Sequence, residues 1–452
     1  MEQKRKAVLN AIPSYGRFLS LREIDQLAEH ASSLKGVSHR SIGKTHEGED
    51  ITMLEIGSGP RTCLMIGVPH SDEPLGSLVT TFFSHWLANH PEEKDFGWRW
   101  LMIPVLERTG MRLNEGWFNT FENYTAMAKT YFREPTEDQY EWTFPIDFQE
   151  HTWDSPAPET EVIMKVLQKE RPEMLYGLHN TSFYDAYYYL SEDLPEVYPE
   201  LRKLSTKLRI PLSDSVPDVP FGKLYAHGFF GMYGLKDYVE YYRDNYPEVL
   251  QFLRRGACSD EWYKDNIGGF SFNCEVPMYR SPKMLDTRPS GLKLKTVYRN
   301  EFKRHKAAIE YVTRIMKELE PYSDLAEPNL YRAASKHIIV AQEMMFMRER
   351  LSQEGEDRIA TNAEVFEHGP LSDVGDLFYA GQLWRVAESV CLAGGPTKIC
   401  RLMDGMETWL QTMGKGVKDN GGFYQIPIKS AVKLQLGSLL IIADAIGKRK
   451  RK

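Results

Sequence analysis

The chain has 452 residues, more than one ordinary hydrophobic core accommodates, so its length predicts two domains. Hydrophobic residues make up 42% of the chain and charged residues 26%, the balance of a soluble globular protein. The formal net charge of −7 argues against nucleic acid as the main partner.

The N-terminus and the cysteines bear on where the protein works. The first residues are charged and are broken by Pro13 and Gly16, unlike a secretory signal. No window of roughly 18 residues is uninterruptedly apolar, so we expect no membrane span. An odd number of widely spaced cysteines, five in all, predicts reduced thiols and a cytoplasmic protein. Cys391 and Cys400 flank a Gly-Gly-Pro turn and could pair, but we expect no disulfide there.

Taken in chain order, the hydrophobic pattern predicts strands that alternate with helices. Strands are expected at 37–42, 51–56, 61–68, 98–106, 174–178 and 271–274. Helices are expected at 23–34, 75–87 and 158–169. This alternation predicts an α/β fold with a mixed, mainly parallel central sheet flanked by helices.

Beyond about residue 321 the pattern becomes helical. Helix-periodic runs cover 330–351, 374–392, 397–413 and 428–446. The stretch 321–328, with a proline at each end, is the predicted boundary between an α/β domain over 1–320 and an α-helical extension over 321–452. We expect the extension to shield a cleft, bind a partner or form a homo-oligomer contact.

The most informative stretch is His70-Ser71-Asp72-Glu73, directly after the strand expected at 61–68. A neutral imidazole and a carboxylate three residues apart can converge on one Zn²⁺. His179 and Glu275 also follow predicted strands, and the carboxyl ends of such strands gather at one edge of a sheet. Taken alone an H-x-x-E pair is weak, because a histidine near an apolar strand is usually structural. The combination predicts a zinc hydrolase.

Several segments, in order, resemble the carboxypeptidase A-like zinc metallopeptidases. Residues 37–57 read VSHRSIGKTHEGEDITMLEIG and are similar to the family's opening pattern I-G-x-S-x-E-G-R-x-I, with Thr45 for Ser and Glu49 for Arg. The His70 motif, a Pro-Glu-Thr helix start at 158–160 and Leu178-His179-Asn180 follow in family order. Residues 268–275, GGFSFNCE, resemble the strand that carries the catalytic glutamate. The resemblance covers roughly residues 20 to 320.

The resemblance implies a metallocarboxypeptidase that uses one Zn²⁺ per chain. His70, Glu73 and His179 would hold the metal, and a water bound to it would attack the scissile carbonyl. Glu275 would act as the general base and pass the proton to the leaving amine. The implied reaction releases a C-terminal residue from a peptide or peptide-like substrate with a free carboxylate. A strand-end salt bridge is the structural alternative for Glu275.

The family also uses two arginines, one for the oxyanion and one, in an Asn-Arg pair, for the substrate's terminal carboxylate. A guanidinium suits both tasks because it offers paired donors to oxyanions. Arg112 and Arg133 are the candidates, and their two roles are not separated. Phe132 stands where the family has Asn before the second arginine. A structural salt bridge is the alternative for either one.

Asp260 lies at the place that resembles the floor of the family's specificity pocket, two residues before Trp262. A carboxylate there favours a cationic side chain such as Lys or Arg, or the free amine of diaminopimelate. A one-residue slip would put Glu261 in this place, and a solvated loop acid is equally compatible with the sequence.

Two other functions stay open at this point. A zinc-dependent N-acyl amino acid deacylase, as in the aspartoacylase-like branch, also keeps H-x-x-E and a later histidine. A non-catalytic binding module on a peptidase fold is the third possibility, although the retained ligands and Glu275 argue against it. Cleavage of acyl amino acids but of no peptide would favour the deacylase.

Overall fold

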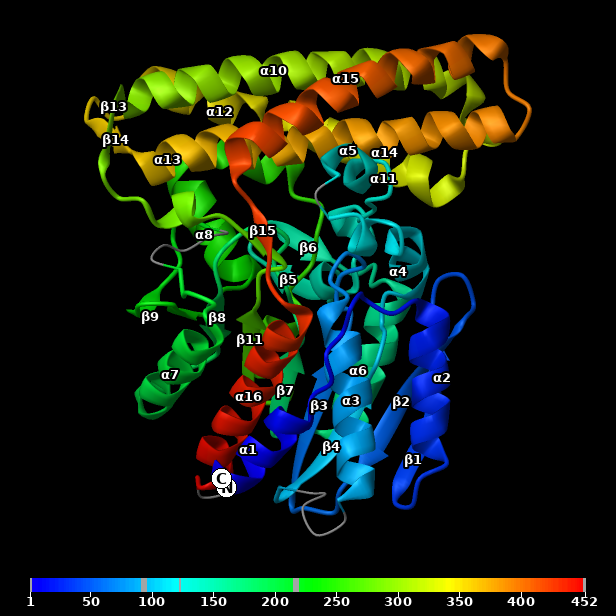
Figure 1. The fold of residues 1–452 in the computed structure, drawn as a ribbon, viewed down its shortest axis with the longest axis vertical. Helices are drawn as coiled ribbons and strands as arrows, with labels where there is room; N and C mark the ends of the chain where they lie inside the picture. The colour runs from blue at the N-terminus through cyan, green and yellow to red at the C-terminus, as the bar shows by residue number, and fades with distance from the viewer. Residues whose placement is uncertain (1, 91–95, 122, 214–218, 450–452) are drawn as a thin grey trace. The chain divides into compact units, whose positions relative to one another are not determined.

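The computed structural model describes residues 2–90, 96–121, 123–213 and 219–449 (Figure 1). Its internal contacts divide the chain into two units. The first comprises Met1–Arg112, Thr136–Met278 and Ile426–Lys452, and the second comprises Leu113–Pro135 and Tyr279–Gln425. This division differs from the predicted boundary at 320/321, because a long helix before that point belongs with the later helices and the last helix returns to the first unit.

The first unit is built on a mixed sheet. Among the described residues nine strands pair in the order β1-β2-β4-β3-β7-β11-β8-β10-β9. They are β1 (Val37–Lys44), β2 (Asp50–Ile56), β3 (Arg61–Ile66), β4 (Trp98–Ile103), β7 (Met174–Gly177), β8 (Tyr187–Leu190), β9 (Leu224–Ala226), β10 (Phe229–Gly231) and β11 (Phe270–Glu275). Parallel pairs join β4, β3, β7 and β11 at the centre. Outside them β8 and β10 also pair in parallel, and the remaining pairs are antiparallel. The predicted α/β class with helices around a mixed sheet is confirmed.

One of the flanking helices, α2 (Leu21–Ser32), begins at a serine that caps its N-terminus. Helix α2 starts after Ser20, whose hydroxyl accepts a hydrogen bond from Glu23 N (3.3 Å), while Ser20 N donates to the Glu23 carboxylate (2.8 Å). This reciprocal cap gives partners to two backbone N–H groups, those of Glu23 and Ser20, that would otherwise lack them. The other helices of this unit are α1 (Glu2–Ala11), α3 (Leu75–Asn89), α6 (Pro158–Glu170), α7 (Tyr198–Leu208), α8 (Leu235–Asn245), α9 (Ser259–Asn266) and α16 (Ile428–Gly447). Helix α4 (Arg108–Asn114) crosses the sequence boundary between the two units.

The two faces of the sheet are covered by different helices. Successive side chains of a strand point to opposite faces. Leu64 of β3 and Leu175 of β7 pack with Ile163 of α6 in one hydrophobic cluster. On β7 the next side chain, Tyr176, donates its hydroxyl hydrogen to the backbone carbonyl of Gln435 in α16 (3.2 Å). In Figure 1, α16 lies near β11 and β7, and α3 lies near β3.

The last helix, α16, is a core helix of the first unit. It is long and apolar enough to cross a membrane by length and composition, but 72% of its most apolar window is buried inside the protein. Its buried polar side chains bind the sheet beneath it: Gln435 Nε2 donates to the carbonyl of His179, and Ser438 Oγ lies 2.8 Å from the Tyr188 hydroxyl. Residues 428–447 are therefore not part of a separate extension, contrary to the predicted domain limit.

The second unit is mostly helical, as the pattern beyond residue 321 predicts. Its longer helices are α10 (Leu294–Leu319), α11 (Pro328–Glu343), α12 (Met345–Glu354), α14 (Ser372–Leu392) and α15 (Thr397–Gly421), with short α5 (Tyr124–Ala128) and α13 (Asn362–Phe366). The single run expected at 330–351 is two helices that meet near Met344. A buried carboxylate, Glu301, joins three elements by pairing with Arg348, Ser372 and His368.

Short two-stranded ladders complete both units. In the first unit β5 (Ile146–Phe148) pairs with β6 (His151–Trp153). In the second unit β12 (Tyr279–Arg280) pairs with β15 (Tyr424–Gln425), and β13 (Pro289–Lys293) pairs with β14 (Ile359–Thr361).

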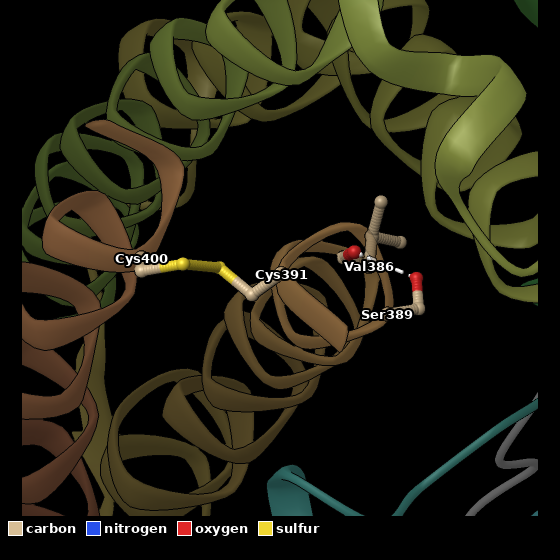
Figure 2. The surroundings of a disulfide bond; sticks show 4 residues. All are labelled: Val386, Ser389, Cys391 and Cys400. Atoms are coloured by element: carbon tan, nitrogen blue, oxygen red, sulfur yellow. Dashed lines mark hydrogen bonds between the residues drawn. A yellow bond between two sulfur atoms is a disulfide. The ribbon is translucent and has the colours of Figure 1, made fainter. Parts of the chain in front are cut away.

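A disulfide joins α14 to α15 within the second unit (Figure 2). The Cα atoms of Cys391 and Cys400 lie 5.8 Å apart across the Gly-Gly-Pro turn, where Gly394 has a φ of 83° that only glycine adopts readily. The expectation of free thiols at this pair is wrong, because the turn places the end of one helix beside the start of the next. The cysteines no longer argue for a cytoplasmic location, which stays a prediction.

We predict that denatured, unreduced protein contains three titratable thiols, from Cys63, Cys258 and Cys274, and five after reduction. A colorimetric thiol titration before and after reduction measures this. Replacement Cys391→Ser should release the Cys400 thiol, so that this variant titrates one thiol more than the wild type before reduction. Five thiols in the unreduced wild-type protein would contradict the bond.

Candidate metal centre

The three side chains predicted as metal ligands come together at the ends of β3 and β7. One ligand atom each of His70, Glu73 and His179 lies within 4.8 Å of the other two, and all three residues are buried. His179 Nδ1 is 3.0 Å from Glu73 Oε2, and His70 Nδ1 is buried with no hydrogen-bond partner in the described chain. A buried polar nitrogen without a partner is costly. Two imidazoles and a carboxylate fit the ligand set of a zinc site.

The backbone that leads from β3 to His70 is strained and closely packed. Val68 has a φ of 50°, a left-handed conformation that a β-branched residue rarely adopts. The preceding Gly67 donates its N–H to the carbonyl of Ile103 (2.8 Å), and a Cβ at this glycine would lie 2.3 Å from the carbonyl oxygen of Pro104. Such strain persists only where surrounding contacts hold it. The β3–β4 junction therefore sets the direction in which His70 leaves the sheet.

Asn180, the residue after the third ligand, positions the second ligand. Glu73 N donates to the carbonyl of His70 (3.0 Å), which closes a turn before α3. Asn180 N donates to Glu73 Oε2 (3.1 Å), and Asn180 Oδ1 accepts from Leu75 N (3.2 Å). The strand end that carries His179 thus also fixes the Glu73 carboxylate and the first turn of α3.

A fourth buried residue, the acid Glu141, lies against both histidines and was not predicted. Its Oε2 is 2.9 Å from His70 Nε2 and 3.2 Å from His179 Nε2. For His179 the other ring nitrogen, Nδ1, faces Glu73. A carboxylate behind a metal-bound histidine fixes the ring and increases its basicity. Glu141 lies on the short helix η3 (Tyr140–Trp142), in an irregular stretch where the sequence does not distinguish it from neighbouring acids.

The charges of neighbouring side chains determine the direction in which the pKa values of Glu141 and His179 shift. Burial raises the pKa of Glu141, but the adjacent His179 and His70 outweigh it and hold this pKa well below the ordinary value of a glutamate. Burial lowers the pKa of His179, but Glu141, Glu73 and Glu275 outweigh it and raise this pKa well above its ordinary value. The cluster therefore favours a positive charge at its centre.

Glu275, the predicted general base, is the last residue of β11. Its Oε1 lies 3.9 Å from His179 Nδ1, and its side chain is 13% exposed. The parallel pairing of β11 with β7 places Asn273 beside Gly177, so the two strands end together. A carboxylate at this strand end lies beside the ligand cluster and keeps some access to solvent. Its catalytic role stays a prediction.

Asp260 and its neighbour Glu261 have different hydrogen-bond partners. Asp260 is buried, and its Oδ2 accepts a hydrogen bond from Asn273 Nδ2 (3.3 Å) on β11. Glu261 instead accepts from the first two backbone N–H groups of α8 (2.8 and 3.2 Å). Asp260 is therefore the one of the two that contacts β11, and its place in a specificity pocket stays a prediction. The solvated loop acid considered from the sequence is excluded.

The two predicted arginines are not brought to the cluster by any described contact of the first unit. Arg112 is half-exposed, and its guanidinium pairs with Glu49, which also accepts from Arg108 Nε (3.3 Å). Binding a substrate anion through Arg112 would require that pair to open. Arg133 belongs to the second unit. Both roles stay predictions.

We predict that Glu141→Gln, which keeps the side chain's size but removes its charge, lowers zinc affinity about 10- to 100-fold, the typical loss for such a supporting carboxylate. Competition with a chromophoric chelator measures the Kd independently of activity. Glu150→Gln is the matched control, because Glu150 is exposed on the same irregular stretch. An unchanged Kd in Glu141→Gln would show that Glu141 does not support the ligands.

No family model and no curated protein matches the chain. Three solved structures are similar to part of it. A metallo-carboxypeptidase from Burkholderia cenocepacia is 13% identical over 56% of this chain and 58% of its own, with a TM-score of 0.32. Bovine thrombin-activatable fibrinolysis inhibitor, in complex with tick carboxypeptidase inhibitor, is 13% identical over 57% and 86%, with a TM-score of 0.34. A metallo-carboxypeptidase from Pseudomonas aeruginosa, in complex with (2-guanidinoethylmercapto)succinic acid, is 12% identical over 56% and 58%, with a TM-score of 0.33.

This chain thus spans less than two thirds of the two bacterial enzymes. The class named by these structures is the class that the sequence segments resemble. At these identities and TM-scores the likeness says nothing about activity. A functional proposal therefore rests on the His70–Glu73–His179 cluster.

Proposed function

We propose that the protein is a zinc-dependent metallopeptidase that hydrolyses a peptide or amide bond and releases a C-terminal residue. One observation carries the proposal: the buried His70–Glu73–His179 cluster, whose ligand atoms lie within 4.8 Å of one another. A set of two imidazoles and one carboxylate is typical of catalytic zinc sites that keep a position open for water or substrate. One Zn²⁺ per chain is the expected cofactor.

The chain's own residues divide the work between them. Bound Zn²⁺ supplies Lewis-acid chemistry, which polarises a carbonyl and acidifies a water. Glu275 takes the proton of the attacking water and delivers it to the leaving amine. Its partial exposure allows a water and a substrate to reach it. Glu141 holds both imidazoles through their Nε2 atoms, so that the rings need not reorient during the reaction.

Asp260 supports a preference for a cationic side chain. Burial, together with the nearby charge of Glu141, raises the pKa of Asp260 to about 6. Its Oδ1 is buried with no hydrogen-bond partner among residues that the structure describes. A buried acceptor in this state favours a donor-rich, positively charged group. We therefore propose a C-terminal Lys, Arg or diaminopimelate-like residue as the one released.

We predict about one zinc per chain in protein purified without chelators, as a set of three protein ligands with one open position implies. Elemental analysis measures it, and His70→Ala should lose the metal. Glu275→Gln should retain zinc but lower kcat about 10²- to 10⁴-fold, the usual contribution of a general base. Equal activity of Glu275→Gln and wild type, or a folded wild type that takes up no zinc, would overturn the mechanism.

The substrates used in that assay also decide between the two hydrolase hypotheses. Peptides with free C-termini and N-acyl amino acids should be tested side by side on the wild type. Cleavage of acyl amino acids without cleavage of any peptide would replace the peptidase by the deacylase.

We predict that Asp260→Asn lowers the kcat/KM ratio of Lys-ended over Leu-ended peptides about tenfold, the loss of one charged hydrogen bond. The wild-type ratio should fall as the pH falls through about 6, because protonation neutralises Asp260. The same kcat/KM ratio measured for Asp260→Asn should not change as the pH passes through about 6. Asp265→Asn, exposed on the same helix α9, is the control. A ratio unchanged by Asp260→Asn would mean that Asp260 is not the selector.

A further inference from the structure

An arginine with no assigned role, Arg255, contacts two aromatic rings of the first unit. Its guanidinium carbon lies 4.6 Å from the ring centroid of Trp142 and 4.6 Å from that of Tyr238. Both rings attract the cation through their faces, and the two contacts together restrict the plane of the guanidinium. The side chain is therefore oriented before any ligand arrives.

One edge of this guanidinium has no partner. Nε and Nη2 of Arg255 are both buried and form no hydrogen bond within the described parts of the chain. Contact with aromatic rings stabilises the charge, but it does not satisfy N–H donors in the plane of the group. The N–H bonds of Nε and Nη2 point the same way along one edge, where a carboxylate accepts through both oxygens. A buried, unfilled donor edge of this kind fits a carboxylate.

The backbone ties Arg255 to the metal centre. Gly256 N donates to the carbonyl of Trp142 (2.6 Å), and Ala257 exchanges two backbone hydrogen bonds with Phe144 (2.9 and 3.3 Å). A Cβ on Gly256 would lie 2.1 Å from the carbonyl oxygen of Phe144, so only glycine permits this approach. Trp142 directly follows Glu141, whose carboxylate contacts both metal-ligand histidines.

The same short stretch of chain leads from Arg255 to Asp260. Along the chain, Arg255 is thus linked to two residues of the site: to Glu141 through the backbone bridge next to it, and to Asp260 five positions later in sequence. A C-terminal residue with a cationic side chain carries one negative and one positive group. Arg255 and Asp260 offer the complementary charges.

We propose that Arg255 binds the terminal carboxylate of the substrate through its Nε and Nη2 edge. The identity of the ligand rests on the proposed hydrolysis of peptides with a free C-terminus, whereas the carboxylate chemistry rests on the unfilled donor edge alone. Arg255 acts in substrate binding and takes no part in proton transfer. It supplies a carboxylate ligand within the first unit, where Arg112 is already paired with Glu49.

The test is a binding measurement on full-length, zinc-loaded Glu275→Gln protein, whose expected turnover is about 10²- to 10⁴-fold slower than that of the wild type. Isothermal titration calorimetry compares acetyl-Ala-Lys with its C-terminal amide, which lacks the carboxylate. The acid should bind about 10- to 100-fold more tightly than the amide, the range expected for hydrogen bonds between charged groups. Adding Arg255→Gln should abolish this discrimination and leave binding of the amide unchanged.

Arg254→Gln is the matched control, because it removes a neighbouring arginine on the same loop and should keep the discrimination. Zinc content and thermal unfolding show that each variant is folded. If Arg255→Gln does not fold, Arg255→Lys replaces it, since it keeps the charge and the stem but loses the paired donor edge, and it should reduce the discrimination at least severalfold. Discrimination that stays at the wild-type level in either folded variant overturns the proposal.

The two proposals fail in different ways. Wild-type protein that prefers the acid through Arg255 but hydrolyses no peptide would remove the proposed function and keep the carboxylate site. Wild-type protein that hydrolyses peptides while Arg255→Gln keeps the acid-to-amide preference would remove only the carboxylate site. A background protein that binds acid and amide equally also overturns the role of Arg255.

Discussion

Two imidazoles share one carboxylate in this protein, and much of the first unit is arranged around that contact. Glu141 Oε2 lies within 3.2 Å of Nε2 on both His70 and His179, and all three residues are buried. Buried charges are tolerated only when they are paired. Glu141, Glu73 and Glu275 together raise the pKa of His179, so the centre favours a positive charge. This charge pattern and the set of two imidazoles and a carboxylate fit a bound metal cation.

The central sheet and helix α16 support the cluster of His70, Glu73 and His179. Parallel pairing of β3, β7 and β11 ends three strands at one edge, each followed or closed by a residue of the cluster. Helix α16 then places Gln435 against the carbonyl of His179 at the back of the sheet. A segment more than 250 residues away in sequence thereby supports the third ligand. The helix is apolar because it is a core helix, and its polar contacts at Gln435 and Ser438 fix its register on the strands.

The proposed selection of a substrate depends on a second pair of charges. Asp260 is a buried acceptor with a free oxygen, and Arg255 is a buried donor with a free edge, and both are carried by one short stretch before and within α9. Each is preorganised by its neighbours: Asn273 for the acid, and the rings of Trp142 and Tyr238 for the cation. We propose that such a site recognises a zwitterionic end of a chain without large rearrangement, because the donors and acceptors are desolvated before binding.

The sequence by itself determined the alternation of strands and helices and therefore the class of fold. It also determined His70, Glu73, His179 and Glu275 as candidates, because each follows an apolar strand and strand ends meet at one edge of a sheet. Only the tertiary structure decided that Glu141 stands behind the histidines, that Asp260 rather than Glu261 faces β11, and that 428–447 joins the first unit. It also decided the bond between Cys391 and Cys400 and the open edge of Arg255. These features arise from contacts between segments distant in sequence or from the path of a turn. Local periodicity and spacing do not show which side chains such contacts leave paired or unpaired.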